Sequence, residues 1–520
     1  MYNKWRNNLF RHTKFCSFLL GIISVAGLPP YYLFPACILS FSLLFYLLTK
    51  VNTLTKSFAI GYWFGVGHFG LGLSWIANAL LIDISSLGWL YPITILAAGL
   101  FFGIFSGLAT IFICKFTSLF SKYLAFTSFW SISEWLRSFI LTGFPWNLIG
   151  STLTFTPELY QSASIFGVYG LSLITILFCT SPILLFSTSY KDKVIAFLLL
   201  LLLPLINYGY GSYRISKQHS NFIQNGINIR LVQPSIAQNL KWNIDTLEQN
   251  FSKHIELSKQ DGLENIDFVI WGETASPFAL DRDNKHKQQL LAAIPQQGYL
   301  ITGAVRIQLS PSGRPIPFNS MLAFNKQGDI VTQYDKSHLV PFGEYIPLRQ
   351  YFPNWIKPIT NTITNFQAGL GPHSLKIADI PPFGTLICYE IIFPAQIVDK
   401  NNRPQWIINL TNDGWYGDSA GPHQHLVSTI MRAVEEGLTT VRVANNGISA
   451  VINPLGQIIA FMPLNHIGIL DVQLPQKLSI ATPYGTYGNI IPLSMMILLL
   501  IIAICFSVST YYSLFLNPKK

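Results

Sequence analysis

Long apolar stretches separated by short loops constrain what this chain can fold into more than any other feature. One run covers residues 15–49 and is interrupted by Pro29 and Pro30. The others lie at 57–82, 88–114, 123–141, 160–187, 194–210 and 487–508. A helix needs about 20 apolar residues to span a bilayer, so most of these stretches are long enough. Only 11% of the 520 residues are charged, against about 25% in soluble domains. This composition predicts a membrane protein and excludes a disordered, coiled-coil or collagen-like chain.

The positions of Lys and Arg predict the orientation of these stretches, because basic residues collect in short cytoplasmic loops. They stand at both termini and after every second stretch: Lys4, Arg6, Arg11, Lys14, Lys50, Lys56, Lys115, Lys122, Lys191, Lys193, Lys519 and Lys520. The loops at 83–87 and 142–159 contain none, and Arg137 departs from the alternation. Eight spans with both termini in the cytoplasm satisfy this pattern, with Pro29–Pro30 as a turn.

The first apolar stretch has an alternative interpretation as a signal peptide. It follows a basic start, and Ser24-Val25-Ala26 resembles a cleavage site. A second apolar segment follows almost at once, which favours a helical hairpin.

The net charge of +10 divides unevenly along the chain. Residues 212–486 hold 21 Lys and Arg against 20 Asp and Glu, and the remainder holds 13 against 4. The basicity is therefore an orientation signal, and nucleic acid is a poor candidate partner. We predict three parts: transmembrane helices 1–7 in 1–211, an exported domain in 212–486, and helix 8 with a cytoplasmic tail in 487–520.

Cysteine usage indicates one chemically distinct thiol. Five cysteines lie in apolar stretches, where Cys serves as a small hydrophobic residue: Cys16, Cys37, Cys114, Cys179 and Cys505. Cys388 is the only cysteine in the exported part. It is either buried and inert or retained for chemistry.

The exported part reads as an α/β domain, because short β-branched runs alternate with polar helical stretches. The predicted strands are Ile227–Val232, Asp267–Trp271, Tyr299–Ala304, Gly384–Cys388, Trp406–Leu410 and Ile448–Ile452. The predicted helices are Trp242–Ser258 and Gln424–Glu436. In such folds ligand sites gather at the carboxyl ends of strands.

Three reactive side chains follow predicted strands or occupy a neighbouring loop. Glu273 and Cys388 each end an apolar strand, and Lys336 stands in a loop with little other basic character. If they converge, Cys388 is a nucleophile, Glu273 its base and Lys336 the donor to a tetrahedral oxyanion. Apolar surroundings are expected to raise the pKa of Glu273, and the Lys336 ammonium is expected to favour the thiolate.

This arrangement resembles the nitrilase superfamily, whose Cys-Glu-Lys triad sits on an αββα sandwich. Eight spans around it narrow the resemblance to the membrane-embedded apolipoprotein N-acyltransferase family. The motifs that carry the resemblance are Glu134-Trp135-Leu136-Arg137, Gly143-Phe144-Pro145-Trp146, Gln233-Pro234, Lys241-Trp242, Trp271-Gly272-Glu273-Thr274-Ala275, Cys388-Tyr389-Glu390, Asn412-Asp413-Gly414-Trp415-Tyr416-Gly417 and Asn445-Asn446-Gly447-Ile448. Gly272 stands where many relatives have proline, and Tyr416 where Phe is frequent. The implied architecture is an eight-helix transmembrane domain with the sandwich inserted between spans 7 and 8.

The resemblance also implies roles for residues around the triad. Glu344 supports the site beside Lys336, and Tyr389 and Glu390 shape the pocket around the thiol. Trp242 and Trp415 are expected to contact acyl chain or lipid. Exposed aromatic residues near the outer interface are expected to form a belt and an entry rim: Trp75, Trp89, Tyr91, Phe144 and Trp146.

The implied reaction is a two-step acyl transfer in the bacterial inner membrane, with the catalytic domain in the periplasm. Cys388 takes an acyl group from a phospholipid, usually phosphatidylethanolamine, as a thioester. The N-terminal S-diacylglyceryl cysteine of an apolipoprotein then receives it as an amide, and no cofactor is needed. One alternative is a membrane-tethered nitrilase-type amidase or hydrolase with the same triad. Another is a transporter or lipid-binding protein with a decayed enzyme domain, which the intact triad argues against.

Other polar residues invite simpler interpretations. His423 and His425 lack a Cys or carboxylate partner at metal spacing, so no metal site is expected. His338 is interpreted as a structural hydrogen-bonding residue. Glu134 and Arg137 either pair with each other or meet a lipid headgroup.

Overall fold

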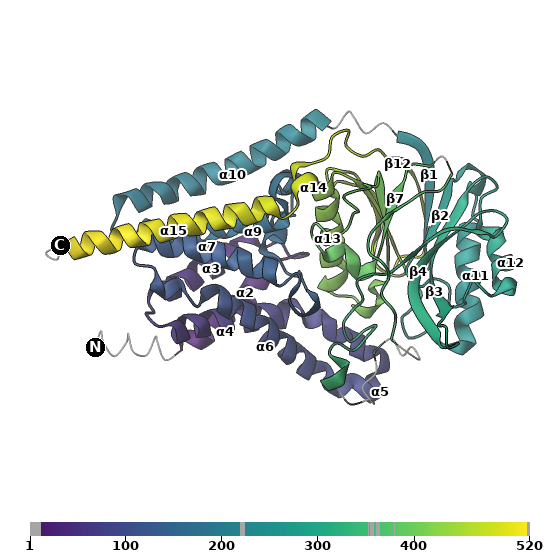
Figure 1. Ribbon diagram of the computed structural model, residues 1–520, viewed down its shortest axis with the longest axis horizontal. Coiled ribbons are helices and arrows are strands. Elements are labelled where there is room, and N and C mark those ends of the chain that lie inside the picture. The colour runs from purple at the N-terminus through teal and green to yellow at the C-terminus, as the bar shows by residue number, and fades with distance from the viewer. Residues whose placement is uncertain are drawn as a thin grey trace. The chain divides into compact units, whose positions relative to one another are not determined.

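The computed structural model describes residues 12–218, 224–351, 353, 358, 359, 365–378 and 380–516. They form two compact units (Figure 1). The helical unit comprises residues up to Ala77, Trp89–Lys217 and the segment from Thr482 onward. The sandwich unit comprises Asn78–Gly88 and Gln218–Ala481.

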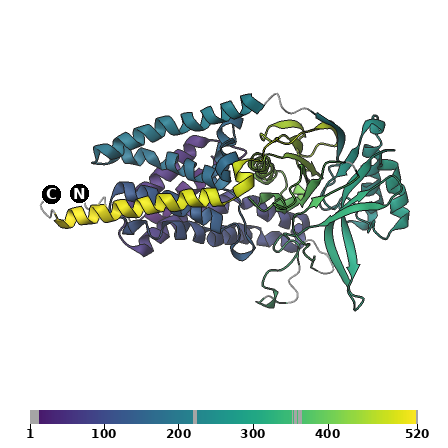
Figure 2. The same ribbon diagram turned by 45° about the horizontal axis from the view of Figure 1, so that its top comes forward.

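The helical unit contains a long helix at each predicted apolar stretch. These helices are α2 (Thr13–Val25), α3 (Phe34–Thr49), α4 (Leu54–Gly72), α6 (Tyr91–Thr110), α7 (Leu119–Leu136), α9 (Ala163–Thr180), α10 (Tyr190–Gln218) and α15 (Ile490–Leu516). Short helices connect some of them, among them α5 (Ile84–Leu87), α8 (Pro157–Tyr160) and α14 (Pro483–Tyr487). The chain turns between α2 and α3, where Pro29 and Pro30 were expected to place a turn. The last helix, α15, is the long yellow ribbon of Figure 2.

Several of these helices are long and apolar enough to cross a membrane. Within the described chain, four helical segments meet both conditions: Ser74–Lys115, Ala163–Phe186, Tyr190–Gln218 and Ile490–Tyr511. Thr13–Val25 and Phe34–Thr49 are shorter apolar helices. The count of eight crossings stays a prediction. Five of the basic residues behind it lie outside the described residues: Lys4, Arg6, Arg11, Lys519 and Lys520.

Small residues allow the first helices of this unit to approach closely. A Cβ atom added at Gly65 would lie 2.8 Å from the Cα of Gly103, so α4 and α6 meet backbone to backbone. A Cβ atom added at Gly21 would lie 2.0 Å from the carbonyl oxygen of Phe64. Such packing is typical of helices in lipid, where van der Waals contact replaces the hydrophobic effect between helices.

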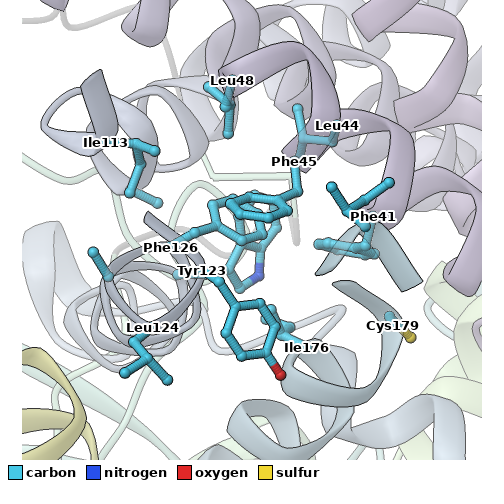
Figure 3. Close-up of a cluster of buried hydrophobic side chains, with 14 of the residues drawn as sticks. Phe41, Leu44, Phe45, Leu48, Ile113, Tyr123, Leu124, Phe126, Ile176 and Cys179 are labelled. Atoms are coloured by element: carbon cyan, nitrogen blue, oxygen red, sulfur yellow. The ribbon is translucent and has the colours of Figure 1, made fainter. Parts of the chain in front are cut away.

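The centre of the helical unit is an apolar cluster rich in aromatic rings (Figure 3). The rings of Phe45 and Phe126 stack with centroids 5.8 Å apart, and Phe41 meets Trp130 edge-on at 5.0 Å. Cys37 and Cys179 are fully buried members of this cluster. Both therefore lie in apolar surroundings, as their positions in the sequence indicated.

Two of the expected belt aromatics are not exposed. Trp75 and Trp146 have only 5% and 3% of their surface accessible. Their rings pack against each other with centroids 4.7 Å apart, and Trp146 also stacks on Phe144. The expectation of an exposed rim was wrong for this pair, because aromatic rings close in space bury one another. Trp89 is exposed, as expected.

Glu134 and Arg137 form their hydrogen bonds with other groups rather than with each other. Glu134 Oε1 accepts hydrogen bonds from the amide of Ile149 at 3.0 Å and from Trp130 Nε1 at 3.3 Å. Arg137 Nη1 donates to the carbonyl oxygens of Phe144 and Trp146. The two side chains thus hold the segment that follows α7 in place. Of the two alternatives expected for them, mutual pairing is not found among the described ion pairs, and contact with a lipid headgroup stays a prediction.

Two six-stranded sheets form the sandwich unit. The first has the order β12-β1-β2-β3-β4-β5 and the second β11-β10-β9-β8-β7-β6. The strands are β1 (Gln224–Gln233), β2 (Phe268–Trp271), β3 (Tyr299–Leu309), β4 (Pro315–Phe324), β5 (Ile330–Asp335), β6 (Ser374–Leu375), β7 (Phe383–Ile387), β8 (Trp406–Thr411), β9 (Thr439–Ala444), β10 (Ser449–Ile452), β11 (Ile458–Met462) and β12 (Gly468–Pro475). In each sheet three parallel strands are central and antiparallel strands flank them. The outermost strands β5 and β11 return to the direction of the central strands of their sheets.

Helices cover the outer faces of the two sheets (Figure 1). Helices α11 (Leu247–Ser258) and α12 (Asn284–Leu290) pack on the first sheet through an apolar cluster that includes Phe251 and Trp271. Helix α13 (Ala420–Glu436) covers the second sheet. A second apolar cluster fills the space between the sheets with side chains from both. The predicted two-sheet nitrilase-like sandwich is therefore confirmed.

Two helix starts differ from the prediction. Helix α11 begins at Leu247 and not at Trp242, because Asn243 Oδ1 accepts the amide of Asp245 and a 3₁₀ turn occupies Ile244–Thr246. Helix α13 begins at Ala420, four residues before the predicted start, with Ser419 as its N-cap.

Candidate active site

Cys388 is the first residue after β7 and has an unusual backbone conformation. Its φ is +51°, in the left-handed region that residues with a Cβ rarely adopt. Two groups bond its carbonyl oxygen: His425 Nε2 at 3.1 Å and Asn409 Nδ2 at 3.5 Å. Only 5% of the residue is exposed. The strand end thus presents the thiol in a strained geometry of the kind found at functional sites.

Glu273 reaches the same point from the first sheet. It lies two residues after β2 and is buried. Its Oε1 accepts hydrogen bonds from Asn319 Nδ2 at 2.9 Å and Lys336 Nζ at 3.2 Å. The Cys388 thiol interacts with the Glu273 carboxylate and lowers the pKa of that carboxylate. A carboxylate in this position can accept the thiol proton directly.

Lys336 and Glu344 complete the charged cluster. Lys336 follows β5, which runs parallel to β2, so both residues leave the same edge of the first sheet. Lys336 Nζ donates to Glu344 Oε1 at 3.0 Å as well as to Glu273. Glu344 Oε2 accepts the amide of Val340 at 2.8 Å, and all three side chains are buried. Three strand ends from two sheets therefore bring the predicted triad together.

The pKa values define the resting protonation of the cluster. Burial raises the pKa of Glu273, but the ammonium groups of Lys336 and Lys241 outweigh burial and the net shift is downward. The predicted rise was wrong, because the sequence did not locate these cations. Burial and the neighbouring Glu273 raise the pKa of the Cys388 thiol to about 12, although Lys336 opposes this. Burial lowers the pKa of Lys336, but Glu273 and Glu344 outweigh it and raise it above its usual value. The site therefore rests as a thiol, a carboxylate and an ammonium. Lys336 favours the thiolate, as expected, but burial and Glu273 outweigh its effect on the Cys388 pKa.

Glu390 ties the Lys336 loop to the Cys388 strand end. Its Oε1 accepts hydrogen bonds from the Ser337 amide and hydroxyl, the His338 amide and the Tyr334 hydroxyl, at 2.7–3.1 Å. Its Oε2 accepts the amide of Ile387 at 2.7 Å. Tyr389 is buried and its ring lies edge-on to Phe393, on which the ring of His338 stacks. Tyr389 and Glu390 directly follow Cys388 in the chain. The hydrogen bonds of Glu390 hold the Lys336 loop and the end of β7 together.

A buried ionic network supports Cys388 from the second sheet. Asp413 binds His425 Nδ1 at 2.8 Å and Arg442 Nη2 at 2.6 Å, and all three side chains are fully buried. Because Asp413 holds the His425 ring in place, His425 Nε2 can bond the carbonyl oxygen of Cys388. Among the described residues, no group of three or more His, Cys, Asp or Glu could hold a metal ion. His425 is thus part of a hydrogen-bond network.

The tryptophans predicted for substrate contact lie in different settings. Trp242 is 41% exposed and Trp415 is half-buried, both in the sandwich unit. Trp146 belongs to the helical unit and is buried. Their contact with a substrate stays a prediction.

Sequence reasoning missed two residues of the cluster. Asn319, in β4, donates from Nδ2 to both Glu273 and Glu344. Its signal was an Asn inside an apolar strand, where Asn is depleted. Lys241 donates from Nζ to the Glu273 carbonyl oxygen at 2.9 Å. Its signal was the Lys241-Trp242 motif, to which no role for the lysine had been attached.

Comparison with known proteins agrees with this architecture. Residues 228–484 match the carbon-nitrogen hydrolase family, and the sandwich with its Cys-Glu-Lys cluster defines a protein of that class. Residues 20–181 match the apolipoprotein N-acyltransferase N-terminal domain. The chain belongs to the apolipoprotein N-acyltransferase family.

Relatives in that family are similar over nearly their whole length. The apolipoprotein N-acyltransferase of Rhodopseudomonas palustris is 35% identical over 508 residues, which covers 93% of this chain and 94% of the relative. That of Rickettsia typhi is 36% identical over 498 residues, which covers 94% and 97%. Among solved structures, an amidase from Nesterenkonia sp. is 17% identical with a TM-score of 0.36, over 49% of this chain and 93% of that chain. The family relationship supports an N-acyltransferase function, and the apolar helices support a membrane protein.

Proposed function

We propose that this protein transfers an acyl group from a membrane phospholipid to the N-terminal S-diacylglyceryl cysteine of apolipoproteins, through a thioester on Cys388. The observation that carries the proposal is the convergence of three buried side chains, since the Cys388 thiol interacts with the Glu273 carboxylate, to which the Lys336 ammonium donates at 3.2 Å. This arrangement suits nucleophilic attack on an acyl carbon. The family relationship points to lipoprotein as the acceptor.

In the first step the Cys388 sulfur attacks the ester carbonyl of a phospholipid, with phosphatidylethanolamine as the expected donor. Glu273 accepts the thiol proton as the carbon–sulfur bond forms. Lys336 donates to the tetrahedral oxyanion, and losing such a donor costs roughly 3–4 kcal/mol in the transition state. The carbon–oxygen bond then breaks, Glu273 returns the proton to the leaving oxygen, and a lysophospholipid departs.

In the second step the α-amino group of the S-diacylglyceryl cysteine attacks the thioester carbonyl. Glu273 accepts a proton from the amine, and Lys336 again faces the oxyanion. The carbon–sulfur bond breaks, the sulfur regains its proton from Glu273, and the product is an amide. No cofactor enters the scheme.

The membrane context gives a reason for the helical unit. Both substrates carry acyl chains, whose removal from lipid costs about 0.8 kcal/mol per buried CH₂. We place helices α2, α3, α4, α6, α7, α9, α10 and α15 across the bacterial inner membrane, with the sandwich between spans 7 and 8 in the periplasm. The distribution of Lys and Arg supports this orientation. Protease treatment of spheroplasts should cleave loops of the sandwich unit, and protection of all of them would contradict the orientation.

The chemistry is tested by looking for the acyl-enzyme. The purified full-length protein is incubated with phosphatidylethanolamine vesicles, quenched, and its Cys388 peptide is examined by mass spectrometry. A fatty-acyl adduct is expected, and its absence would reject the mechanism. Addition of a diacylated lipopeptide should discharge the adduct to a triacylated product. Discharge only to free fatty acid would instead support the membrane-tethered amidase or hydrolase.

A further inference from the structure

Lys241 is a second buried lysine at the site, and the reaction scheme above does not use it. It lies in the loop between β1 and α11 and is 5% exposed. Its Nζ donates to the backbone carbonyl oxygen of Glu273 at 2.9 Å. Lys241 therefore binds the main chain of the residue whose side chain is the candidate base. A lysine is rarely buried unless its charge has partners, so its position needs an explanation.

The charges around Lys241 explain why it is buried. Glu273 and Cys388 both interact electrostatically with its ammonium group. The cluster contains two carboxylates, Glu273 and Glu344, but Lys336 is the one ammonium that binds both. Lys336, Lys241, Glu273 and Glu344 together carry two positive and two negative charges. Glu390 is a further buried carboxyl that interacts with Lys336, but it accepts its hydrogen bonds from Tyr334, Ser337, His338 and Ile387. Without Lys241, one carboxylate would be left without compensating charge in a medium where that is costly.

The other groups that face this cluster do not replace Lys241. His254 of α11 interacts with Lys241, but burial lowers the pKa of His254 to about 4, so its ring is neutral at physiological pH. On the side of the second sheet, Asp413 is negative and is engaged by Arg442 and His425. Tyr416 also interacts with Glu273 and Cys388, and burial raises its pKa, so it stays neutral.

We infer that Lys241 is a positioning residue that acts through Glu273: it fixes the Glu273 backbone and supplies the second cation that keeps the Glu273 carboxylate ionised. The inference rests on the proposed acyl transfer at Cys388. Burial lowers the pKa of Lys241 to about 8, against the opposing effect of Glu273 and Cys388. Below about that pH the residue is mainly an ammonium ion.

Loss of the Lys241 charge should shift the pH dependence of acyl-adduct formation toward higher pH. Lys241 lowers the pKa of Glu273, and removing a nearby cation raises the pKa of a carboxylate by about 1–3 units. In Lys241→Met, Glu273 should therefore become protonated at a higher pH than in the wild type. The acidic limb of acyl-adduct formation should move upward by about 1–3 pH units.

The test measures the rate of acyl-adduct formation on Cys388 from acidic to alkaline pH in the full-length protein. Lys241→Met should shift the acidic limb, and Lys241→Arg should restore its position because it keeps the charge. Lys326→Met is the matched control, since Lys326 Nζ also donates to backbone carbonyls, of Leu291 and Ile294, but on another part of the sandwich unit. The control should keep the wild-type profile.

Two results would overturn the inference. One is a Lys241→Met profile that coincides with the wild type. The other is a fall by the same factor at every pH, which would mean that Lys241 only maintains the fold. If the wild type forms no adduct, the proposed function has failed, and the inference is then tested by iodoacetamide. Alkylation of the Cys388 peptide should need a higher pH in Lys241→Met than in Lys241→Arg, and equal curves would reject the role.

Discussion

The helical unit and the sandwich unit distribute polarity in opposite ways. On α10 the helical unit exposes Phe197, Leu205 and Ile206, each at about three-fifths of its surface (62%, 59% and 66%). It buries small hydroxyl residues instead, such as Thr110, Ser128 and Thr175, whose hydroxyl groups donate to helix carbonyls. Such a unit suits lipid as its solvent.

The sandwich unit has an apolar interior between its sheets but also buries paired charges. Arg230, Arg432 and Arg442 are all fully buried, and each is paired with a carboxylate. Burial therefore has a different meaning in the two units. Many buried hydroxyl residues of the helical unit bond local backbone, whereas the buried Arg442 of the sandwich unit belongs to a charged network that reaches Cys388 through Asp413 and His425.

Two buried cysteines test this difference most strongly. Cys388→Ala should abolish the acyl adduct, because no other nucleophile stands beside Glu273. Cys179→Ala should leave the adduct at the wild-type level, since Cys179 lies in the apolar cluster of the helical unit. Mass spectrometry of the intact protein after exposure to phospholipid measures both. An adduct that survives Cys388→Ala would remove the distinction between the two thiols.

Replacing the candidate base should have the next largest effect. Glu273→Gln keeps the shape and the contact with Asn319 but cannot accept the thiol proton. Adduct formation should slow by about 10²–10⁴-fold, the usual contribution of general base catalysis. The rate is measured at neutral pH, where Glu273 is ionised because its pKa is lowered. Near-wild-type acylation would assign the base elsewhere.

Breaking the buried network should cost stability. Arg442→Met leaves the Asp413 carboxylate buried with one partner fewer, and the free energy of unfolding should fall by about 3–5 kcal/mol. The matched control is Lys259→Met, whose exposed pair with Glu256 spans 3.6 Å and should contribute at most about 1 kcal/mol. Thermal unfolding of the detergent-solubilised protein compares them. Equal melting temperatures would show that the network does not stabilise the fold.

The smallest expected effect is on membrane insertion, when a charge is placed on an exposed apolar position of the helical unit or of the sandwich unit. Leu205→Arg on α10 places a charge on an apolar face and should disfavour membrane insertion by about 2.5–3.5 kcal/mol. Ile459→Arg on the edge strand β11 has a similarly exposed starting residue, at 50% against 59%, and should insert normally. The membrane-inserted fraction of each variant is measured after carbonate extraction. If both variants insert equally well, the α10 face does not contact lipid.

Much of this contrast could be predicted from the sequence, because apolar runs and strand ends are local signals. Glu273 and Cys388 stood at the ends of apolar runs, and parallel strands bring such residues to one edge. Lys336 stood out as a lysine in a loop with little other basic character. Asn319 and Lys241 could not be placed in the same way. Their contacts depend on the register of β4 and on the return of a loop to Glu273, which are decided by tertiary packing.

The same limit explains two of the wrong expectations. The pKa of Glu273 depends on cations that approach from other strands and loops, so apolar flanking residues gave the wrong sign. Trp75 and Trp146 look like surface aromatics in separate segments, yet they bury each other. In both cases the missing information is a pairing between residues distant in the chain.

The division of the cluster between two sheets has a consequence for how the protein is made. Glu273 and Lys336 leave the first sheet, and Cys388 leaves the second, whose strands β6 to β11 all follow β1 to β5 in the chain. The thiol therefore has its base and ammonium neighbours only after the later half of the sandwich has closed on the earlier half. A nascent or partly folded chain carries an ordinary cysteine at this position. Cys388 gains its catalytic neighbours only when the fold is complete.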